Sequence, residues 1–338
     1  MKKIIVAVGL LGAIAWVVRQ LGFRFNRPSP PPPLPVPLQH ELYVADLGSN
    51  RIYSFEITTD GTVVPTPWRI IDGFNQPTVG LNNPFDIAVT NAGEMWVANL
   101  GSQPHDLPSN PSITIYDASS SGAVAPSFTI LPAHVFGPTL IQPVAVAWRN
   151  NPDNLLVLDG TSAGEFTKSQ TPTGSVNELG QPAGLALTLS GTLYVSDQTP
   201  GNNAILSLNL QPHVMDQTPT SRIEGPLTGL NNPAHIAVDT NSRIYVVNRG
   251  TMQLNMQDAS IAVFAAGAAG NVAPIQSIRG SLTSLVEPYG IAVDAADQIF
   301  VTTAHRVLVF AAGATGNVEP QQIISYAEFS NLIGIAAR

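Results

Sequence analysis

A short unit recurs along this chain, and it constrains the fold more than any other feature of the sequence. Its clearest copy runs Glu287-Pro288-Tyr289-Gly290-Ile291-Ala292-Val293-Asp294 and continues, after a polar turn, into Ile299-Phe300-Val301. Related copies begin at Asn83-Pro84, Gln142-Pro143, Gln181-Pro182 and Asn232-Pro233. Each copy reads as a turn, a short β-rich run, a second polar turn and a second β-rich run. Self-similarity at intervals of this size indicates a stacked or radial repeat architecture.

Each repeat is long enough for four strands, and the sixth predicts strands at 290–294, 299–303, 307–310 and near 321–325. The last copy, residues 332–338, stops after its first strand, whereas the first copy, from Glu41, begins at its second strand. These fragments complete each other if the C-terminal strand is the innermost strand of the first blade. The sequence therefore predicts an all-β fold over residues 41–338, a six-bladed β-propeller of four-stranded blades with no free sheet edge at the closure.

The first forty residues have a different character. Lys2 and Lys3 precede an apolar run that Arg19 ends, which is typical of a signal peptide or a membrane anchor over residues 1–23. Residues 24–40 form a proline-rich linker, and such a run acts as a stiff spacer. We expect an exported protein that is periplasmic, at the cell surface or extracellular. It would be bound to a membrane if the N-terminal segment is not cleaved.

Composition limits the partners and the chemistry. The net charge is −8 and no cluster of Lys and Arg lies beyond the N-terminus, so we do not expect a nucleic-acid partner. The chain contains no cysteine, which excludes disulfides, thiolate nucleophiles and cysteine-ligated metals. The 338 residues include 28 glycines and 29 prolines, a content that is typical of many short strands joined by turns.

The repeat resembles the NHL-repeat family of β-propellers through the pattern Pro-x-Gly-Ile-Ala-Val-Asp at 288–294, followed by the β-rich run at 299–303. The resemblance covers nearly everything after residue 40 and implies the propeller fold. It implies little about function, because such propellers include lyases, lactonases, sensor domains and binding modules.

Long connections predict where a partner binds. The segments at 100–112 and 249–259 join the second and third strands of the second and fifth repeats, which lie opposite each other in a ring of six, and 131–141 precedes the third repeat. Insertions on one face of a repeat protein usually form its binding face. The candidate binding residues on this face are Asp86, His105, Asp106, His134, His235, Met252, Met256 and His305.

Two sets of polar residues are candidate metal ligands. Five of the six repeats end their second strand in Asp or Asn, at Asp46, Asn99, Asp159, Asp197 and Asn248. Recurrence in nearly every repeat favours a structural role, in which these side chains bind the backbone of nearby turns. Asp86 and His235 are more unusual, because they occupy a position that holds Gly184, Gly290 and Gly334 in other repeats. They form either a Ca²⁺ or Zn²⁺ site or separate polar loop positions.

Three enzyme families with similar repeats each lack part of their motif here. Resemblance to the amidating lyase would require histidine directly after the repeat proline, where this chain has Phe85, Val144, Ala183, Ala234 and Tyr289. The gluconolactonase-like pattern loses both of its asparagines and keeps Asp197. His235 matches the histidine of streptogramin-lyase-like propellers, but no partnering glutamate is evident.

We therefore expect a propeller without an intact catalytic motif and with no required cofactor. It would act as a binding or assembly module for a protein or a small molecule. A metal-dependent hydrolase or lyase with Asp86 and His235 at its centre is one alternative. A homo-oligomeric envelope or filament subunit is the other.

Overall fold

The computed structural model describes residues 40–101, 111–131, 142–150, 153–160, 162–167, 172–176, 179–209, 218–251 and 258–338. The predicted signal segment and nearly all of the predicted linker lie outside these ranges. In the described ranges, no helix has the length and apolar character needed to cross a membrane.

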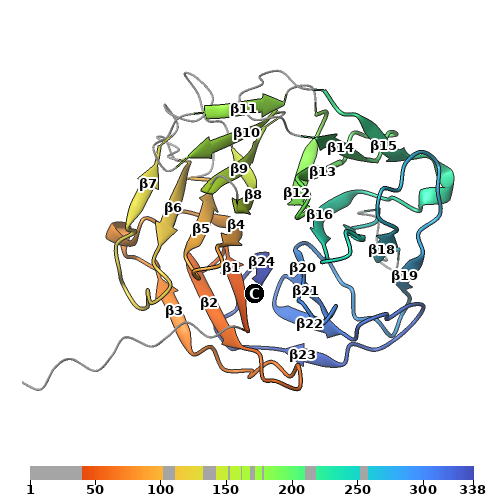
Figure 1. The fold of residues 1–338 in the computed structure, drawn as a ribbon. Coiled ribbons are helices and arrows are strands. Elements are labelled where there is room, and N and C mark those ends of the chain that lie inside the picture. The colour runs from red at the N-terminus through yellow and green to blue at the C-terminus, as the bar shows by residue number, and fades with distance from the viewer. Residues whose placement is uncertain are drawn as a thin grey trace, which may run out of the picture. The chain divides into compact units, whose positions relative to one another are not determined.

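The described residues from 40 onward form a six-bladed β-propeller, in which six four-stranded sheets are arranged around a central axis (Figure 1). Blade 1 contains β1 (Glu41–Asp46), β2 (Arg51–Glu56), β3 (Arg69–Asp72) and β24 (Leu332–Ala337). Blade 2 contains β4 (Pro84–Val89), β5 (Met95–Asn99), β6 (Ser112–Tyr116) and β7 (Phe128–Ile130). Blade 3 contains β8 (Pro143–Asn150), β9 (Asp153–Asp159), β10 (Ser162–Thr167) and β11 (Pro172–Val176).

Blade 4 contains β12 (Pro182–Leu187), β13 (Thr192–Asp197), β14 (Ala204–Asn209) and β15 (Ser221–Glu224). Blade 5 contains β16 (Pro233–Val238), β17 (Ile244–Asn248), β18 (Ser260–Phe264) and β19 (Gln276–Arg279). Blade 6 contains β20 (Ile291–Val293), β21 (Ile299–Thr303), β22 (Arg306–Phe310) and β23 (Gln322–Ile324). Short 3₁₀ turns, η1 (Pro77–Val79) and η3 (Pro226–Thr228), precede β4 and β16.

The ring closes as the sequence predicts. The C-terminal strand β24 pairs antiparallel with β1, with Leu42 opposite Ala337 and Val44 opposite Ile335. The backbone groups of Glu41 and Arg338 exchange two further hydrogen bonds. Blade 1 therefore has the strand order β24-β1-β2-β3, and its innermost strand comes from the other end of the chain.

The core lies between the blades. Six clusters of buried apolar residues each join two neighbouring blades, because successive side chains of a strand point to opposite faces of its sheet. In β1, for example, Leu42 and Val44 pack toward blade 6, whereas Tyr43 and Ala45 pack toward blade 2. This arrangement explains why the inner strands are apolar on both faces.

The turns between the third and fourth strands connect neighbouring blades. Gly122, Gly270 and Gly316 each pair in parallel with an isoleucine in the outermost strand of the preceding blade. The two last glycines belong to the nearly identical segments 265–274 and 311–320, and both have positive φ, as the turn pattern predicts. At the junction of blades 6 and 1, the Gln322 side chain bonds both the backbone N–H and the C=O of Val63 instead.

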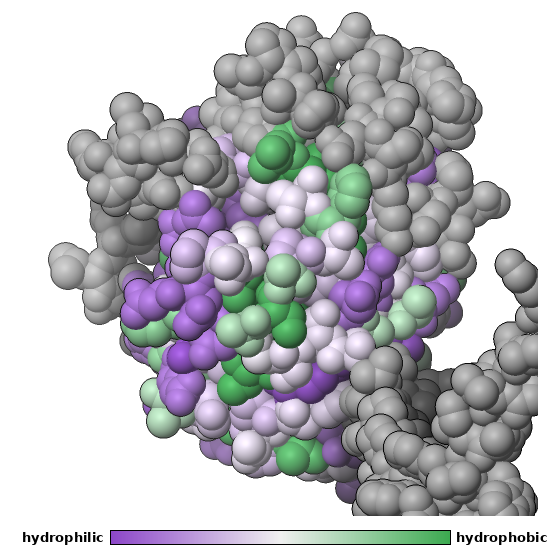
Figure 2. Space-filling view, turned by 90° about the vertical axis from the view of Figure 1, so that its left-hand side faces the viewer, coloured by the Kyte–Doolittle hydropathy of each residue, from purple (hydrophilic) through white to green (hydrophobic). Residues whose placement is uncertain are grey.

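The outer surface is mixed in character. On the side of the ring where β3 and β7 lie, apolar residues form small separate patches on a pale and polar surface (Figure 2). Phe74, Phe128 and Leu131 are among the exposed apolar residues of the described ranges. Patches of this kind are ordinary on soluble proteins.

Candidate functional site

A single position near the start of the innermost strands differs from blade to blade. It is occupied, from blade 1 to blade 6, by Gly334, Asp86, Ala145, Gly184, His235 and Gly290. The two polar residues belong to β4 and β16, whose blades lie opposite each other (Figure 1). Nevertheless, Nδ1 of His235 lies 3.8 Å from Oδ1 of Asp86. The two side chains therefore meet across the ring axis.

Glycine in the preceding blade makes room for each member of this pair. A Cβ atom on Gly334 would lie 2.6 Å from the Cα of Asp86, and one on Gly184 would lie 2.7 Å from the Cα of His235. Real Cβ contacts are not this short, so the neighbouring inner strands approach too closely for any larger residue. The glycine pattern that marks the repeat is thus a packing requirement at this end of the ring.

A β-bulge lies at the start of the two strands that carry Asp86 and His235. In β4 the pairing with β5 shifts by one residue between Pro84 and Asp86, and similar shifts occur in β8, β12 and β16. The extra residue of such a bulge leaves the regular ladder, which redirects its side chain. In blade 2 this residue is Phe85, and Tyr289 follows the equivalent proline of blade 6.

Aromatic and cationic side chains surround the pair. The Tyr289 ring centre lies 5.3 Å from that of Phe85 and 5.7 Å from that of His235. The guanidinium carbon of Arg249, directly after β17, lies 5.0 Å from the centre of the Tyr289 ring, which is within cation–π range. Phe85, Arg249 and Tyr289 are partly exposed, whereas Asp86 and His235 are buried.

Burial controls the electrostatics of the cluster. It raises the pKa of Asp86, and the nearby His235 and the backbone N–H groups of Val146 and Ile87 oppose this rise. The Val146 N–H donates to Oδ2 of Asp86 at 2.9 Å, so this carboxyl group also joins blade 2 to blade 3. Burial likewise raises the pKa of Tyr289 to about 12, against the influence of Arg249, so its hydroxyl stays protonated at neutral pH.

One buried atom of the cluster has no partner. Among the described residues, no group forms a hydrogen bond with Nε2 of His235, although the residue is only 4% exposed. Buried polar atoms almost always have a hydrogen-bond partner, because an unmade bond in the interior costs about 1–3 kcal/mol. Nε2 therefore requires a water or a ligand atom, while the other ring nitrogen faces Asp86.

The recurring Asp and Asn residues have the structural role that their periodicity predicts. Each accepts a hydrogen bond from a backbone N–H close to the start of the innermost strand. These bonds join Asn99 to Asn82, Asp159 to Gln142, Asp197 to Gln181, Asn248 to Asn231, and Asp46 to Asn331. Their oxygens hold the turns that enter the inner strands, so they do not form a free ring of ligands.

The remaining predicted binding residues do not join this cluster in the described structure. His305 is exposed in the tight turn between β21 and β22. His105, Asp106, His134, Met252 and Met256 lie outside the described residues. The described parts of the chain contain no group of three or more His, Asp or Glu side chains that could hold a metal ion. They supply two candidate ligands, Asp86 and His235, and a zinc site would need at least one more from the other loops.

Sequence reasoning identified the central pair but did not identify its surroundings. Phe85, Tyr289 and Arg249 were available as signals, because the first two follow a repeat proline and the third begins a long connection. What the sequence did not reveal is the bulge, which moves the residue after the proline out of the regular alternation.

Of the comparisons with known proteins, the one with solved structures supports the propeller fold. No protein-family model matches this sequence, and no curated protein matches it. A protein of unknown function from Bacteroides caccae is similar in structure, with a TM-score of 0.58 and 9% identity over 89% of this chain and 99% of the other.

Two gluconolactonases are also similar in structure. The periplasmic enzyme of Pseudomonas aeruginosa has a TM-score of 0.51 and 13% identity, over 85% of this chain and 83% of that one. The enzyme of Xanthomonas campestris has a TM-score of 0.52 and 16% identity, over 78% and 79%. At these identities the similarity concerns the propeller fold.

Proposed function

We propose that this protein is an exported, NHL-like propeller that binds a small polar ligand on its axis. The ligand would enter from the side that carries the connections 100–112 and 249–259. The observation that carries the proposal is the buried, unpartnered Nε2 of His235. A ligand oxygen or N–H group that bonds this atom removes the cost of leaving it unpaired.

The surroundings of His235 favour a small molecule over a protein. The His235 side chain is only 5% exposed, so the flat surface of a protein partner could not contact it. Tyr289 packs against the His235 ring, and Phe85 and Arg249 contact Tyr289. Small-molecule sites typically combine aromatic walls with a few polar groups that fix orientation. Here Arg249 supplies a positive charge and His235 supplies the enclosed hydrogen-bonding atom.

The test is a thermal-shift screen of the full-length protein against sugars, sugar acids, lactones and amino acids, followed by titration calorimetry. Loss of a hydrogen bond to a buried imidazole is expected to weaken binding about fivefold to a hundredfold in His235→Ala. The matched control is His305→Ala, which removes an exposed histidine from another turn. Ligands that bind both variants equally well would contradict an axial site.

A second candidate function is lactone hydrolysis, with His235 as general base. The observation in its favour is the pair itself, because a carboxylate beside one ring nitrogen and a free second nitrogen are what a histidine base requires. The structural similarity to two gluconolactonases adds the precedent of this fold, and the same pair could take part in a Ca²⁺ or Zn²⁺ site completed by other loops.

Elemental analysis by plasma mass spectrometry and a lactone-hydrolysis assay separate the two candidates. Turnover that His235→Ala abolishes would favour the hydrolase, and a stoichiometric metal lost in Asp86→Ala would assign the ion to this pair. Reversible lactone binding without turnover would favour the binding module. Light scattering of the full chain and of a chain starting at Gln39 tests the assembly alternative, which predicts different subunit numbers.

A further inference from the structure

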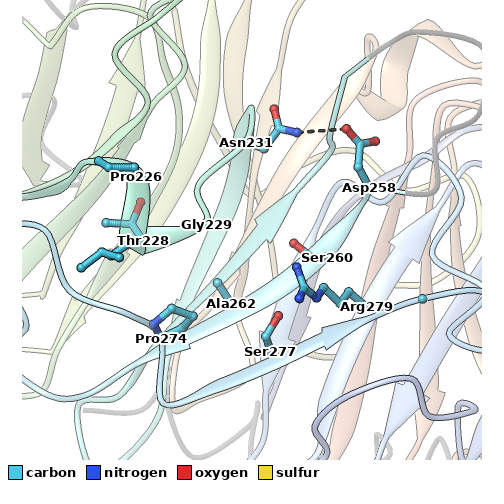
Figure 3. A pocket seen from close by; sticks show the side chains of 12 residues that line it. Pro226, Thr228, Gly229, Asn231, Asp258, Ser260, Ala262, Pro274, Ser277 and Arg279 are labelled. Carbon is cyan, nitrogen blue, oxygen red and sulfur yellow. Dashed lines mark hydrogen bonds between the residues drawn. The ribbon is translucent and has the colours of Figure 1, made fainter.

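A second candidate site lies in the outer strands of blade 5. A cavity of about 770 Å³ is lined on one side by the turn around η3 and on the other by β18 and β19 (Figure 3). Its volume lies within the range of about 300–1,000 Å³ that is usual for small-molecule sites. None of its lining residues belongs to the axial cluster, so this cavity is a separate place in the fold.

The strand register explains why this part of the blade is hollow. Ser260 lies opposite Arg279 and Ala262 lies opposite Ser277, and these four residues share one face of the β18–β19 ladder. Three of the four are small, so they leave space under the preceding turn. The fourth places a guanidinium group beside the two serine hydroxyls, as Figure 3 shows.

Arg279 is not committed to another residue. Across the described ranges, no side chain forms a hydrogen bond or an ion pair with its guanidinium group. Ser260 accepts a hydrogen bond from the amide of Asn248 at 3.2 Å, which leaves its own hydroxyl hydrogen free to donate. An arginine fork next to two hydroxyl donors matches the geometry of a carboxylate.

The acidic residue of the cavity is already occupied. Asp258 accepts bonds from the backbone N–H and the hydroxyl of Thr251 and from the amide of Asn231. The two bonds from Thr251 are the main reason that the pKa of Asp258 is low, so it stays ionised at neutral pH. These bonds of Asp258 hold the two ends of the 249–259 connection together. The charged group of the cavity that remains without a partner among the described residues is Arg279.

The opposite blade contains the same hollow without the charge. A cavity of about 600 Å³ lies at the equivalent place beside the outer strands of blade 2, where Ser112 replaces Ser260, Thr129 replaces Ser277 and Leu131 replaces Arg279. The hollow is therefore a consequence of the repeat, whereas the arginine is particular to blade 5. This difference provides an internal comparison of shape with and without a cation.

We propose that the cavity of blade 5 binds a small organic carboxylate. Its carboxylate pairs with Arg279 and accepts hydrogen bonds from the hydroxyls of Ser260 and Ser277. Its apolar body packs against Pro226 and Pro274, which line the same cavity.

The experiment is a ligand-observed NMR titration of the full-length protein with benzoate, and with benzamide as the neutral analogue. Benzoate is expected to bind saturably and benzamide much more weakly. Loss of charge-assisted hydrogen bonds is expected to weaken benzoate binding about tenfold to a hundredfold in Arg279→Leu. Arg306→Leu, which removes another exposed arginine, is the matched control and should bind as the wild type does.

Further variants separate this site from the axis and from a simple charge effect. His235→Ala should leave benzoate binding unchanged. Leu131→Arg in the Arg279→Leu background should restore binding, because it places the cation in the equivalent hollow. Equal affinity of Arg279→Leu and wild type, or no saturable binding of benzoate, would overturn the proposal. Preference for phenyl phosphate over benzoate would overturn the carboxylate assignment in favour of a phosphate.

Discussion

Removal of residues 332–338 is the most direct test of how this ring is held closed. The deletion removes Leu332, Ile333 and Ile335, which are 1%, 7% and 5% exposed. Full burial of an aliphatic side chain is worth about 1.5–3 kcal/mol, so the three contribute about 5–9 kcal/mol. The hydroxyl of Thr302 also loses its acceptor, the C=O of Ile333. The total stability of a domain is only about 5–15 kcal/mol, so the deleted chain should not fold as a monomer.

Circular dichroism melting and light scattering on the deleted chain would measure this loss. A circular permutant supplies the control. β24 runs antiparallel to β1 and Arg338 lies beside Glu41, so a short turn can join 332–338 directly to residue 40 and form a hairpin. The permutant should melt as the wild type does, because every strand keeps its neighbour. A soluble, monomeric deletion with an unchanged melting temperature would refute the closure of the ring by β24.

Three smaller perturbations test other contacts. Burial raises the pKa of Asp86 above its unfolded value of about 3.9, so the free energy of unfolding should fall as pH rises from the unfolded to the folded pKa. In denaturant melts between pH 4 and 7, Asp86→Asn should flatten this dependence of stability on pH. An unchanged slope would contradict the assignment. Gly334→Ala should cost about 1–3 kcal/mol in the same melts, since its new methyl group meets the backbone of Asp86, and a neutral result would show that the inner strands separate easily. Gln322→Ala should cost about 1–3 kcal/mol because both hydrogen bonds to Val63 are lost. The control Gln321→Ala, at an exposed neighbouring residue, should cost almost nothing. Equal effects of the two variants would show that Gln322 does not hold blades 6 and 1 together.

The architecture could be predicted from the sequence because the strands and turns of each blade lie within one continuous repeat. In blade 6, β21 occupies the predicted 299–303, while β20, β22 and β23 differ from the predicted ranges by one residue at one or both ends. The order β24-β1 followed from two incomplete copies at opposite ends of the chain. Periodic features such as the turn glycines and the Asp or Asn at the end of the second strand also had the expected structural roles.

The site was harder to predict because it depends on distances between blades. The sequence singled out Asp86 and His235 as exceptions to a glycine position, but it could not show that they approach to 3.8 Å across the axis. The contribution of Phe85 depends on a bulge in β4, which changes the direction of one side chain without changing the residue pattern. The cavity of blade 5 depends on cross-strand register, which one sequence does not specify for short outer strands.

Blades 2 and 5 show where this chain departs from its own repeat. Both enter their inner strand through the same five residues, Gly-Leu-Asn-Asn-Pro at 80–84 and 229–233, and both hold this turn with an asparagine, Asn99 or Asn248. The backbone bonds that begin the following connection are also the same in the two blades. The two copies share their framework and differ in the groups that carry chemistry.

Those differences occur at three equivalent positions. Asp86 stands where blade 5 has His235, Leu100 stands where it has Arg249, and Leu131 stands where it has Arg279. The equivalent backbone bonds form in both blades, so the framework requires neither the two arginines of blade 5 nor the two leucines of blade 2. Exchange of Leu100 and Arg249 therefore separates framework from function. The double variant Leu100→Arg, Arg249→Leu should melt as the wild type does, yet lose ligands that depend on the cation beside Tyr289. Unchanged binding would show that Arg249 takes no part in ligand binding.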